Sequence, residues 1–357
     1  MANIFDYLND VAYDSFYDLT VNELDVLALT ELTYLTFDGV VTQEPKRLID
    51  LAPQIPRETT MLTNKNRLQL LDQLSQHKRF KNCKLSNFIN DIDPELQKQF
   101  AAMTYRISLD TYLLVFRGTD DSIIGWKEDF HMTYMKEIPA QKHALQYLQD
   151  FFAQHPNQKV VIAGHSKGGN LAVYAASQLD PLLQKNIVSV YTFDAPGLHK
   201  ELTKKAGYQN MMERTKVFVP QGSIIGMMLE IPDKKIVVRS TALGGIAQHD
   251  TFSWQVEDKH FVQLDETNSD SQQVDTTFKE WVETVPDTEL QLYFDLFFGI
   301  ILDAGISSIN DLSSFKVIEH IHHLFVQAQS LTPEERETMG RLTQLLIDTR
   351  YQAWKNR

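Results

Sequence analysis

The stretch that most constrains the fold of this chain is VVIAGHSKGGNLAVYAA, residues 160–176. Its first three residues predict a short buried strand, and the apolar residues after 170 recur on one side of a helix. Between them lies GHSKG, residues 164–168, which fits the pattern G-x-S-x-G of a sharp strand-to-helix turn that exposes a serine hydroxyl. The same sequence would also fit an ordinary tight turn in which Ser166 is the N-cap of the helix. The interpretation therefore depends on what the rest of the chain supplies.

Strands alternate with helical segments from about residue 115 to 240, which is typical of βαβ units. We therefore predict an α/β protein with an α/β-hydrolase fold, in which helices cover both faces of a mainly parallel central sheet. The segments on which this rests are the predicted helices 21–35, 64–76 and 139–154, a hairpin over 100–108 and 111–118, and the predicted strands 160–162, 187–193, 215–220 and 234–240.

Both ends of the chain add helical segments to this core. Residues 1–90 are predicted to be helical and irregular, with strands beginning near residue 100. Residues 286–304 are apolar nearly all round and should be buried, and Thr332, Pro333 and Glu335 form a strong helix start. We place a boundary near residue 285, which gives an α/β-hydrolase domain over 1–285 and a C-terminal helical extension over 286–357 packed on it.

Charge and composition exclude several classes of partner. The chain has 34 basic and 47 acidic residues, a net charge of -13, which argues against nucleic acid and against docking on an anionic membrane. Its single cysteine, Cys83, allows no internal disulfide and suits a reducing compartment. Neither a leader segment nor the roughly 18 consecutive apolar residues of a membrane span is evident. We expect a cytoplasmic protein without stable membrane insertion; the oligomeric state stays open.

An activated serine needs a base to take its proton and a carboxylate to orient that base. In a parallel sheet these groups belong on loops at the carboxyl ends of strands. Asp194 directly follows the strand 187–193, although an Asp that starts a turn is also common. His249 follows the last predicted strand, in the loop-like stretch GGIAQHDTFSW. We predict Asp194 as the acid and His249 as the base.

The other histidines are weaker candidates for the base. His260, in EDKHF, is the serious rival because it too lies downstream of the sheet. His165 lies inside the turn itself, where neighbouring side chains point apart. His155 lies at the end of a helix before a proline, and His199 is expected in the helix that follows Gly197 and Leu198. The C-terminal helical part contains His320, His322 and His323.

An oxyanion formed at the serine needs two preorganised N–H donors. One should be the backbone N–H of Lys167, the residue after the serine. The other should come from the loop FRGTDDS, residues 116–122, where Gly118 allows close backbone approach and Thr119 offers an N–H and a hydroxyl.

Together these stretches resemble the class 3 (fungal-type) lipases. LLVFRGTDDSIIGWKEDF is similar to the oxyanion stretch of that family, VVIAGHSKGGNLAVYAA to its elbow, and VYTFDAPG to its Thr-Phe-Gly-x-Pro strand end. With NIFDYLND and QHDTFSW added, the chain resembles still more closely an uncharacterised bacterial family of lipase-like hydrolases, the Mbeg-type proteins. The resemblance covers about residues 1–265.

Two residues depart from the class 3 pattern. That family carries its acid after the next strand, where VFVPQGSIIGMML of this chain has Ser223. The resemblance therefore implies a relocated acid, and Asp194 is the natural replacement. Lys167 replaces a residue that is usually apolar, and a cation in the first turn opposes the helix dipole by about 0.3 to 1 kcal/mol. Lys167 could attract an anionic acyl or leaving group, but we favour a solvated side chain pointing off the turn.

We predict a serine hydrolase that cleaves carboxylic esters through an acyl-enzyme, with small ester or lipid-like substrates. The same residues would also suit a thioesterase or an amide hydrolase, or the chain could be a non-catalytic regulatory protein on a hydrolase scaffold. Its His and Asp residues lack the spacing of a metal site, so we expect no cofactor.

Overall fold

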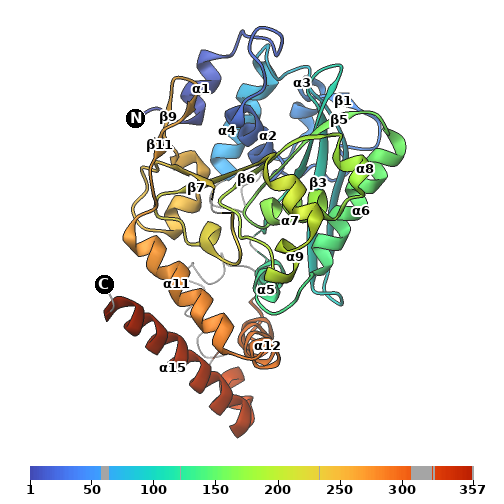
Figure 1. Ribbon diagram of the computed structural model, residues 1–357. Coiled ribbons are helices and arrows are strands. Elements are labelled where there is room, and N and C mark those ends of the chain that lie inside the picture. Colours follow the sequence, from blue (N-terminus) through green and yellow to red (C-terminus); the bar gives the residue numbers. More distant parts are fainter. Residues whose placement is uncertain (58–63, 121, 233, 307–323, 325, 356–357) are drawn as a thin grey trace. The chain divides into compact units, whose positions relative to one another are not determined.

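The computed structural model of this chain describes residues 1–57, 64–120, 122–232, 234–306, 324 and 326–355 (Figure 1). The chain forms two compact units. The first contains Met1–Asp91, Phe100–Gly118 and Ala140–Ser271, and the second contains Ile92–Gln99, Thr119–Pro139 and Gln272–Arg357. The boundary predicted near residue 285 falls inside the second unit, between α11 and α12.

A nine-stranded sheet has the order β1-β2-β3-β4-β5-β6-β7-β8-β11. Its centre is parallel, because β4 to β8 pair in parallel register. The pairs β1·β2, β3·β4 and β8·β11 are antiparallel, so the sheet is mixed. The strands are β1 (Lys46–Arg47), β2 (Lys84–Asp93), β3 (Lys98–Arg106), β4 (Thr111–Phe116), β5 (Lys159–His165), β6 (Ile187–Phe193), β7 (Thr215–Pro220), β8 (Lys235–Val238) and β11 (Gln263–Leu264), with β9 (Val256–Glu257) and β10 (His260–Phe261) paired separately.

The predicted hairpin over 100–118 is confirmed by the antiparallel pair β3·β4. The prediction that strands begin near residue 100 is wrong, since β2 begins at Lys84. The sequence of β2, KLSNFINDID, has few β-branched residues and many Asn and Asp, which are uncommon in strands. This segment becomes a strand through its neighbours in the sheet, which a local pattern does not reveal.

The helices of the α/β region follow the predicted segments closely: α4 and α6 match 64–76 and 139–154, and α2 lies within 21–35. The helices are α1 (Ile4–Asp10), α2 (Glu23–Leu32), α3 (Leu48–Leu51), α4 (Asn64–Gln76), α5 (Ile123–His131), α6 (Pro139–Gln154), α7 (Lys167–Gln178), α8 (Pro181–Gln184), α9 (Lys200–Thr203), α10 (Ala206–Met212), α11 (Ser269–Thr284), α12 (Asp287–Asp303) and α15 (Pro333–Lys355), with the 3-10 turns η1 (Ala52–Gln54), η2 (Ile225–Met227), η3 (Ile246–His249) and η4 (Thr251–Ser253).

Helices cover both faces of the central strands, as the alternation in β6 shows. Tyr191 and Phe193 join a buried cluster that also contains the apolar residues of α2. Thr192, between them, must point to the opposite face. There it lies against Gly169 of α7, where an added Cβ would come within 3.1 Å of the Thr192 Cβ. Helices α2 and α7 therefore pack on opposite faces of the sheet (Figure 1).

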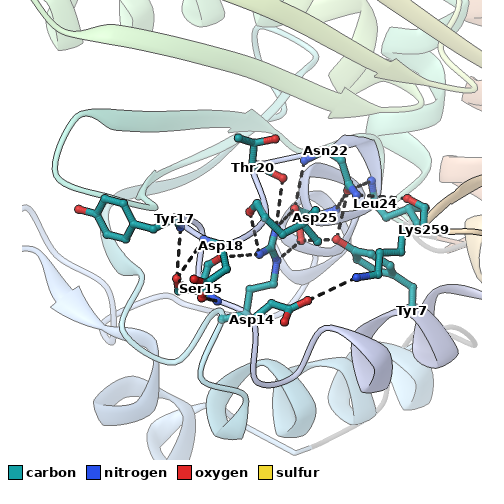
Figure 2. Close-up of polar contacts among 12 residues, drawn as sticks. Tyr7, Asp14, Ser15, Tyr17, Asp18, Thr20, Asn22, Leu24, Asp25 and Lys259 are labelled. Carbon is teal, nitrogen blue, oxygen red and sulfur yellow. Dashed lines mark hydrogen bonds and ion pairs between the residues drawn. The ribbon is translucent and has the colours of Figure 1, made fainter.

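A buried ion pair locks the N-terminal segment into the first unit (Figure 2). Arg79 and Asp25 are both fully buried and lie 2.6 Å apart, and the Tyr7 hydroxyl donates to Asp25 at 2.8 Å. Arg79 also donates to the backbone carbonyls of Ser15, Leu19 and Thr20. Since a buried charge is tolerated only with its partners in place, these bonds hold residues 7–25 against the segment that carries Arg79.

The second unit has its own apolar core on α5, α11, α12 and α15. The Phe130 ring packs on Phe294 with centroids 4.7 Å apart, and Lys127 pairs with Asp295 at 2.7 Å. The prediction that 286–304 is buried all round is wrong, because Leu292 and Phe297 of α12 are exposed. Of the helices in the described part of the chain, none combines the length and the apolar character that a membrane crossing requires.

The predicted helix start at residue 332 is confirmed. The Glu335 backbone N–H donates to the Thr332 hydroxyl at 3.2 Å, and the Thr332 N–H donates to the Glu335 carboxylate at 2.7 Å. This reciprocal pair satisfies donors that the first turn of a helix otherwise leaves unpaired.

Candidate active site

Ser166 occupies a strained turn between β5 and α7. Its backbone has φ 57° and ψ −135°, a region that residues with a Cβ rarely adopt. Its side chain makes no capping hydrogen bond to the helix, so the interpretation of Ser166 as a capping serine is wrong. Strain of this kind persists only where the surrounding structure holds it, and it gathers at functional sites.

The two flanking glycines explain how the chain makes this turn. A Cβ on Gly164 would collide with the backbone of Gly168, and a Cβ on Gly168 would collide with the carbonyl of Phe116. Glycine is therefore required at both positions for helix α7 to start so close to strands β4 and β5.

The structure brings Asp194 and His249 together. The His249 Nδ1–H donates to Asp194 Oδ2 at 2.6 Å, across 55 residues of sequence. Asp194 is fully buried and its backbone also has a positive φ, 43°, whereas the His249 side chain is 22 % exposed. Asp194 follows β6 and His249 follows β8, so both reach the carboxyl ends of parallel strands, as predicted.

The other carboxylate oxygen of Asp194 is held by the segment that follows β7. The Ser223 hydroxyl makes a short hydrogen bond to Asp194 Oδ1, and the Gly226 N–H donates to the same oxygen at 3.1 Å. The Ser271 hydroxyl in turn donates to the Ser223 carbonyl. The residue at the class 3 acid position thus orients a carboxylate that comes from the preceding strand.

His165 links the serine turn to His249. The two imidazole rings are 4.4 Å apart between centroids, and His165 Nε2 lies 3.0 Å from the His249 carbonyl oxygen. Among the described residues, the His249 ring bonds to Asp194 through Nδ1. No hydrogen bond joins His249 Nε2 to Ser166 Oγ in this part of the chain. Such serine–histidine bonds are often long until substrate binds.

Burial, together with the nearby His249, lowers the pKa of His165 to about 4, while Glu31 and Asp194 oppose the shift. Arg67 adds a smaller lowering effect. Between pH 6.5 and about 4 the unfolded chain binds a proton at residue 165 that the folded chain does not, so the free energy of unfolding falls as pH drops through this window.

We therefore expect the wild type to lose about 3 kcal/mol more stability than His165→Gln between pH 7 and pH 4. Urea unfolding of both proteins at a series of pH values measures this difference. Parallel stability curves would show that His165 takes up a proton in the folded protein as readily as in the unfolded chain.

The two predicted oxyanion residues lie in different units. Lys167 begins α7 in the first unit, and it is 1 % exposed, so the prediction of a solvated side chain is wrong. Thr119 belongs to the second unit, where its hydroxyl donates to Asp129 at 2.5 Å. Gly118, the residue before it, is in the first unit, and an added Cβ there would lie 3.0 Å from the Ser166 Cβ.

The rival histidines have other partners. His260 lies on β10 and pairs with Glu23 at 2.7 Å. His155 stacks on Tyr112, and His199 caps α9 by accepting from the Glu201 N–H. The remaining three, His320, His322 and His323, lie outside the described residues.

Three residues of the site were not identified from the sequence: Ser223 as the holder of Asp194, and Tyr34 and His165 beneath the turn. The only sequence signal was the position of Ser223 in the class 3 pattern. In the parts of the chain that the structure describes, no group of three or more His, Cys, Asp and Glu side chains is arranged to hold a metal ion.

The fold and the site define an α/β protein whose strained serine turn lies beside a His–Asp pair. The family model described as Mbeg1-like matches residues 74–299, more than half of the sequence, and the chain therefore belongs to the Mbeg1-like family. A search of the curated proteins finds no match.

Several solved fungal structures are similar to this chain at low identity. A mutant form of MDLA from Penicillium cyclopium is 13 % identical over 69 % of this chain and 87 % of its own, with a TM-score of 0.44. The Rhizomucor miehei lipase–propeptide complex is 17 % identical over 51 % and 68 %, and lipase II from Rhizopus niveus is 20 % identical over 48 % and 71 %, both with a TM-score of 0.33. At these TM-scores none of the three carries an argument about this chain.

Proposed function

We propose that this protein is a serine hydrolase with an α/β-hydrolase fold that cleaves carboxylic esters through an acyl-enzyme. The observation that carries the proposal is the His249–Asp194 hydrogen bond at the carboxyl edge of the sheet, beside the strained serine turn. Because the Nδ1–H group of His249 donates a hydrogen bond to Asp194, the proton of the neutral imidazole is on Nδ1. The lone pair on Nε2 is then available to accept a proton.

In this mechanism Ser166 Oγ attacks the acyl carbon while its proton passes to His249 Nε2. The oxyanion that forms is bound by the backbone N–H of Lys167 and by Thr119. Collapse breaks the ester C–O bond, and the leaving alcohol takes the proton from His249. Water then attacks the acyl-enzyme with His249 as base and releases the acid and Ser166. The role of Thr119 stays a prediction from the sequence, since Thr119 belongs to the second unit.

The choice of an ester substrate rests on the resemblance of the 113–130 and 160–176 stretches to class 3 lipases. In the apolar segment around η2, Met227 is buried and the Gly226 N–H donates to Asp194, so this segment packs against the acid. A small ester or lipid-like molecule with a short to medium acyl chain is the substrate we propose. Graded p-nitrophenyl esters would define the preferred length.

A fluorophosphonate probe tests the proposal directly. Attack by Ser166 Oγ on phosphorus would expel fluoride and leave a covalent adduct that mass spectrometry maps to the peptide containing residue 166. We expect labelling of the wild type and none of Ser166→Ala. A folded wild type that stays unlabelled would instead support a non-catalytic protein on a hydrolase scaffold.

A further inference from the structure

A buried chain of hydrogen bonds runs beneath the serine turn and joins the loop before Thr119 to the His249 backbone. The Gly118 N–H donates to the Tyr34 hydroxyl oxygen at 3.1 Å. The Tyr34 hydroxyl lies 2.9 Å from His165 Nδ1, and His165 Nε2 lies 3.0 Å from the His249 carbonyl oxygen. Tyr34 and His165 are both nine-tenths or more buried.

One protonation state satisfies all three hydrogen bonds. A carbonyl oxygen only accepts, so His165 Nε2 must carry a proton and donate to His249. Burial, with the neighbouring His249, lowers the pKa of His165 to about 4, so the ring is neutral near pH 7 and its Nδ1 accepts. The Tyr34 O–H then donates to Nδ1, because its other acceptor, the His165 carbonyl, lies farther away at 3.4 Å. The Tyr34 oxygen keeps a lone pair for the Gly118 N–H.

The Tyr34 ring is itself held in place by a buried ion pair. The Arg67 guanidinium lies 4.0 Å from the centre of the Tyr34 ring and pairs with Glu31 at 2.9 Å. Glu31 also accepts from the hydroxyl of Thr251, two residues after His249, at 2.8 Å. The N-terminal segment therefore reaches the His249 loop by two routes, through Tyr34–His165 and through Glu31–Thr251.

We propose that Tyr34 is a positioning residue, which acts through Gly118 and His165 to hold the oxyanion loop and His249 in register with Ser166. This inference rests on the proposed function. Removal of the Tyr34 hydroxyl takes away the acceptor of the Gly118 N–H directly. It also takes away the donor that keeps His165 in the tautomer whose Nε2–H bonds the His249 carbonyl. An added Cβ on Gly118 would come within 2.6 Å of the His165 carbonyl, which shows how closely these segments approach.

The test compares Tyr34→Phe with Tyr105→Phe. Tyr105 is also buried, and its hydroxyl bonds to Thr33 and to the Leu29 carbonyl at the C-terminal end of α2. It takes no part in the hydrogen bonds that link Gly118 to His249. We expect kcat for p-nitrophenyl butyrate to fall about 10- to 100-fold in Tyr34→Phe with KM nearly unchanged, since a small misplacement of reacting groups costs about this much. Tyr105→Phe should keep the wild-type kcat even if it unfolds at lower urea.

A second readout is independent of turnover. Nitrogen-15 spectra of the histidine rings should show His165 of the wild type neutral and protonated at Nε2 from about pH 5 to 8. Tyr34→Phe should lose this single tautomer, because Nδ1 has lost its donor. If Tyr34→Phe does not fold, His165→Gln, whose amide can still donate toward His249, should be at least about 10-fold more active than His165→Leu.

The outcomes separate the two proposals. Suppose that the wild type is active. If Tyr34→Phe is then as active as Tyr105→Phe, or if it keeps the wild-type tautomer of His165, the positioning role alone is overturned. A wild type that neither turns over esters nor reacts with the fluorophosphonate overturns the proposed function and this inference with it.

Discussion

Replacement of Ser166 by alanine is expected to lower the kcat for p-nitrophenyl butyrate by about 10⁶-fold. The substitution removes the hydroxyl oxygen of the turn, while the folded scaffold and the His249–Asp194 pair remain. What activity remains should come from binding and oxyanion stabilisation alone. Because the two residues act as one unit, Ser166→Ala/His249→Ala should be no slower than Ser166→Ala.

Ser177→Ala is the matched control for Ser166→Ala. Ser177 is a buried serine of α7, the helix that begins after Ser166, and its hydroxyl donates to the Tyr174 carbonyl at 2.9 Å. It should turn over esters at the wild-type rate. Turnover of Ser166→Ala at a rate of the wild-type order would show that another nucleophile is used, and a further loss in the double variant would show that His249 acts separately from Ser166.

The local elements could be predicted from the sequence because each has a complete local pattern. The apolar spacing of α4 and α6 and the β-branched runs of β6 and β7 define those segments without reference to the rest of the chain. The serine turn was predictable from its short pattern G-x-S-x-G, in which Gly164 lies against the backbone of Gly168 a few residues later. The contact that requires Gly168 is with the Phe116 carbonyl of β4, far away in the sequence. The position of Asp194 and His249 at strand ends followed from the rules of parallel sheets.

What the sequence left hidden depends on contacts between distant segments. The grouping of 119–139 with the C-terminal helices arises from packing such as Phe130 on Phe294, which no local pattern announces. The buried state of Lys167 and the hydrogen bonds of Tyr34 depend likewise on tertiary structure. Tyr34 falls within the predicted helix 21–35, where an aromatic residue ordinarily indicates packing alone, and it lies two residues beyond the end of α2.

The second large effect concerns the acid. Asp194→Asn should lower kcat/KM about 10⁴-fold, because an amide in place of the carboxylate no longer fixes the imidazole in the Nδ1–H tautomer. Ser223→Ala should cost far less: it removes one of the two donors to Asp194 Oδ1, and the Gly226 N–H still holds that oxygen. The two variants together separate the carboxylate itself from the group that orients it.

The exchange of the two side chains is the sharper experiment, because the Ser223 hydroxyl and the Asp194 carboxylate are in direct contact. Asp194→Ser should be nearly inactive, whereas Asp194→Ser/Ser223→Asp places the carboxylate where the class 3 pattern has it and should recover at least about 10-fold of the lost kcat/KM. Ser223→Asp alone puts two carboxylates in one buried site, so one must take up a proton, and stability should fall as pH rises.

If the double variant were no faster than Asp194→Ser, the side chain at 223 could not reach the imidazole. If Asp194→Asn kept the wild-type rate, Asp194 would not be the acid.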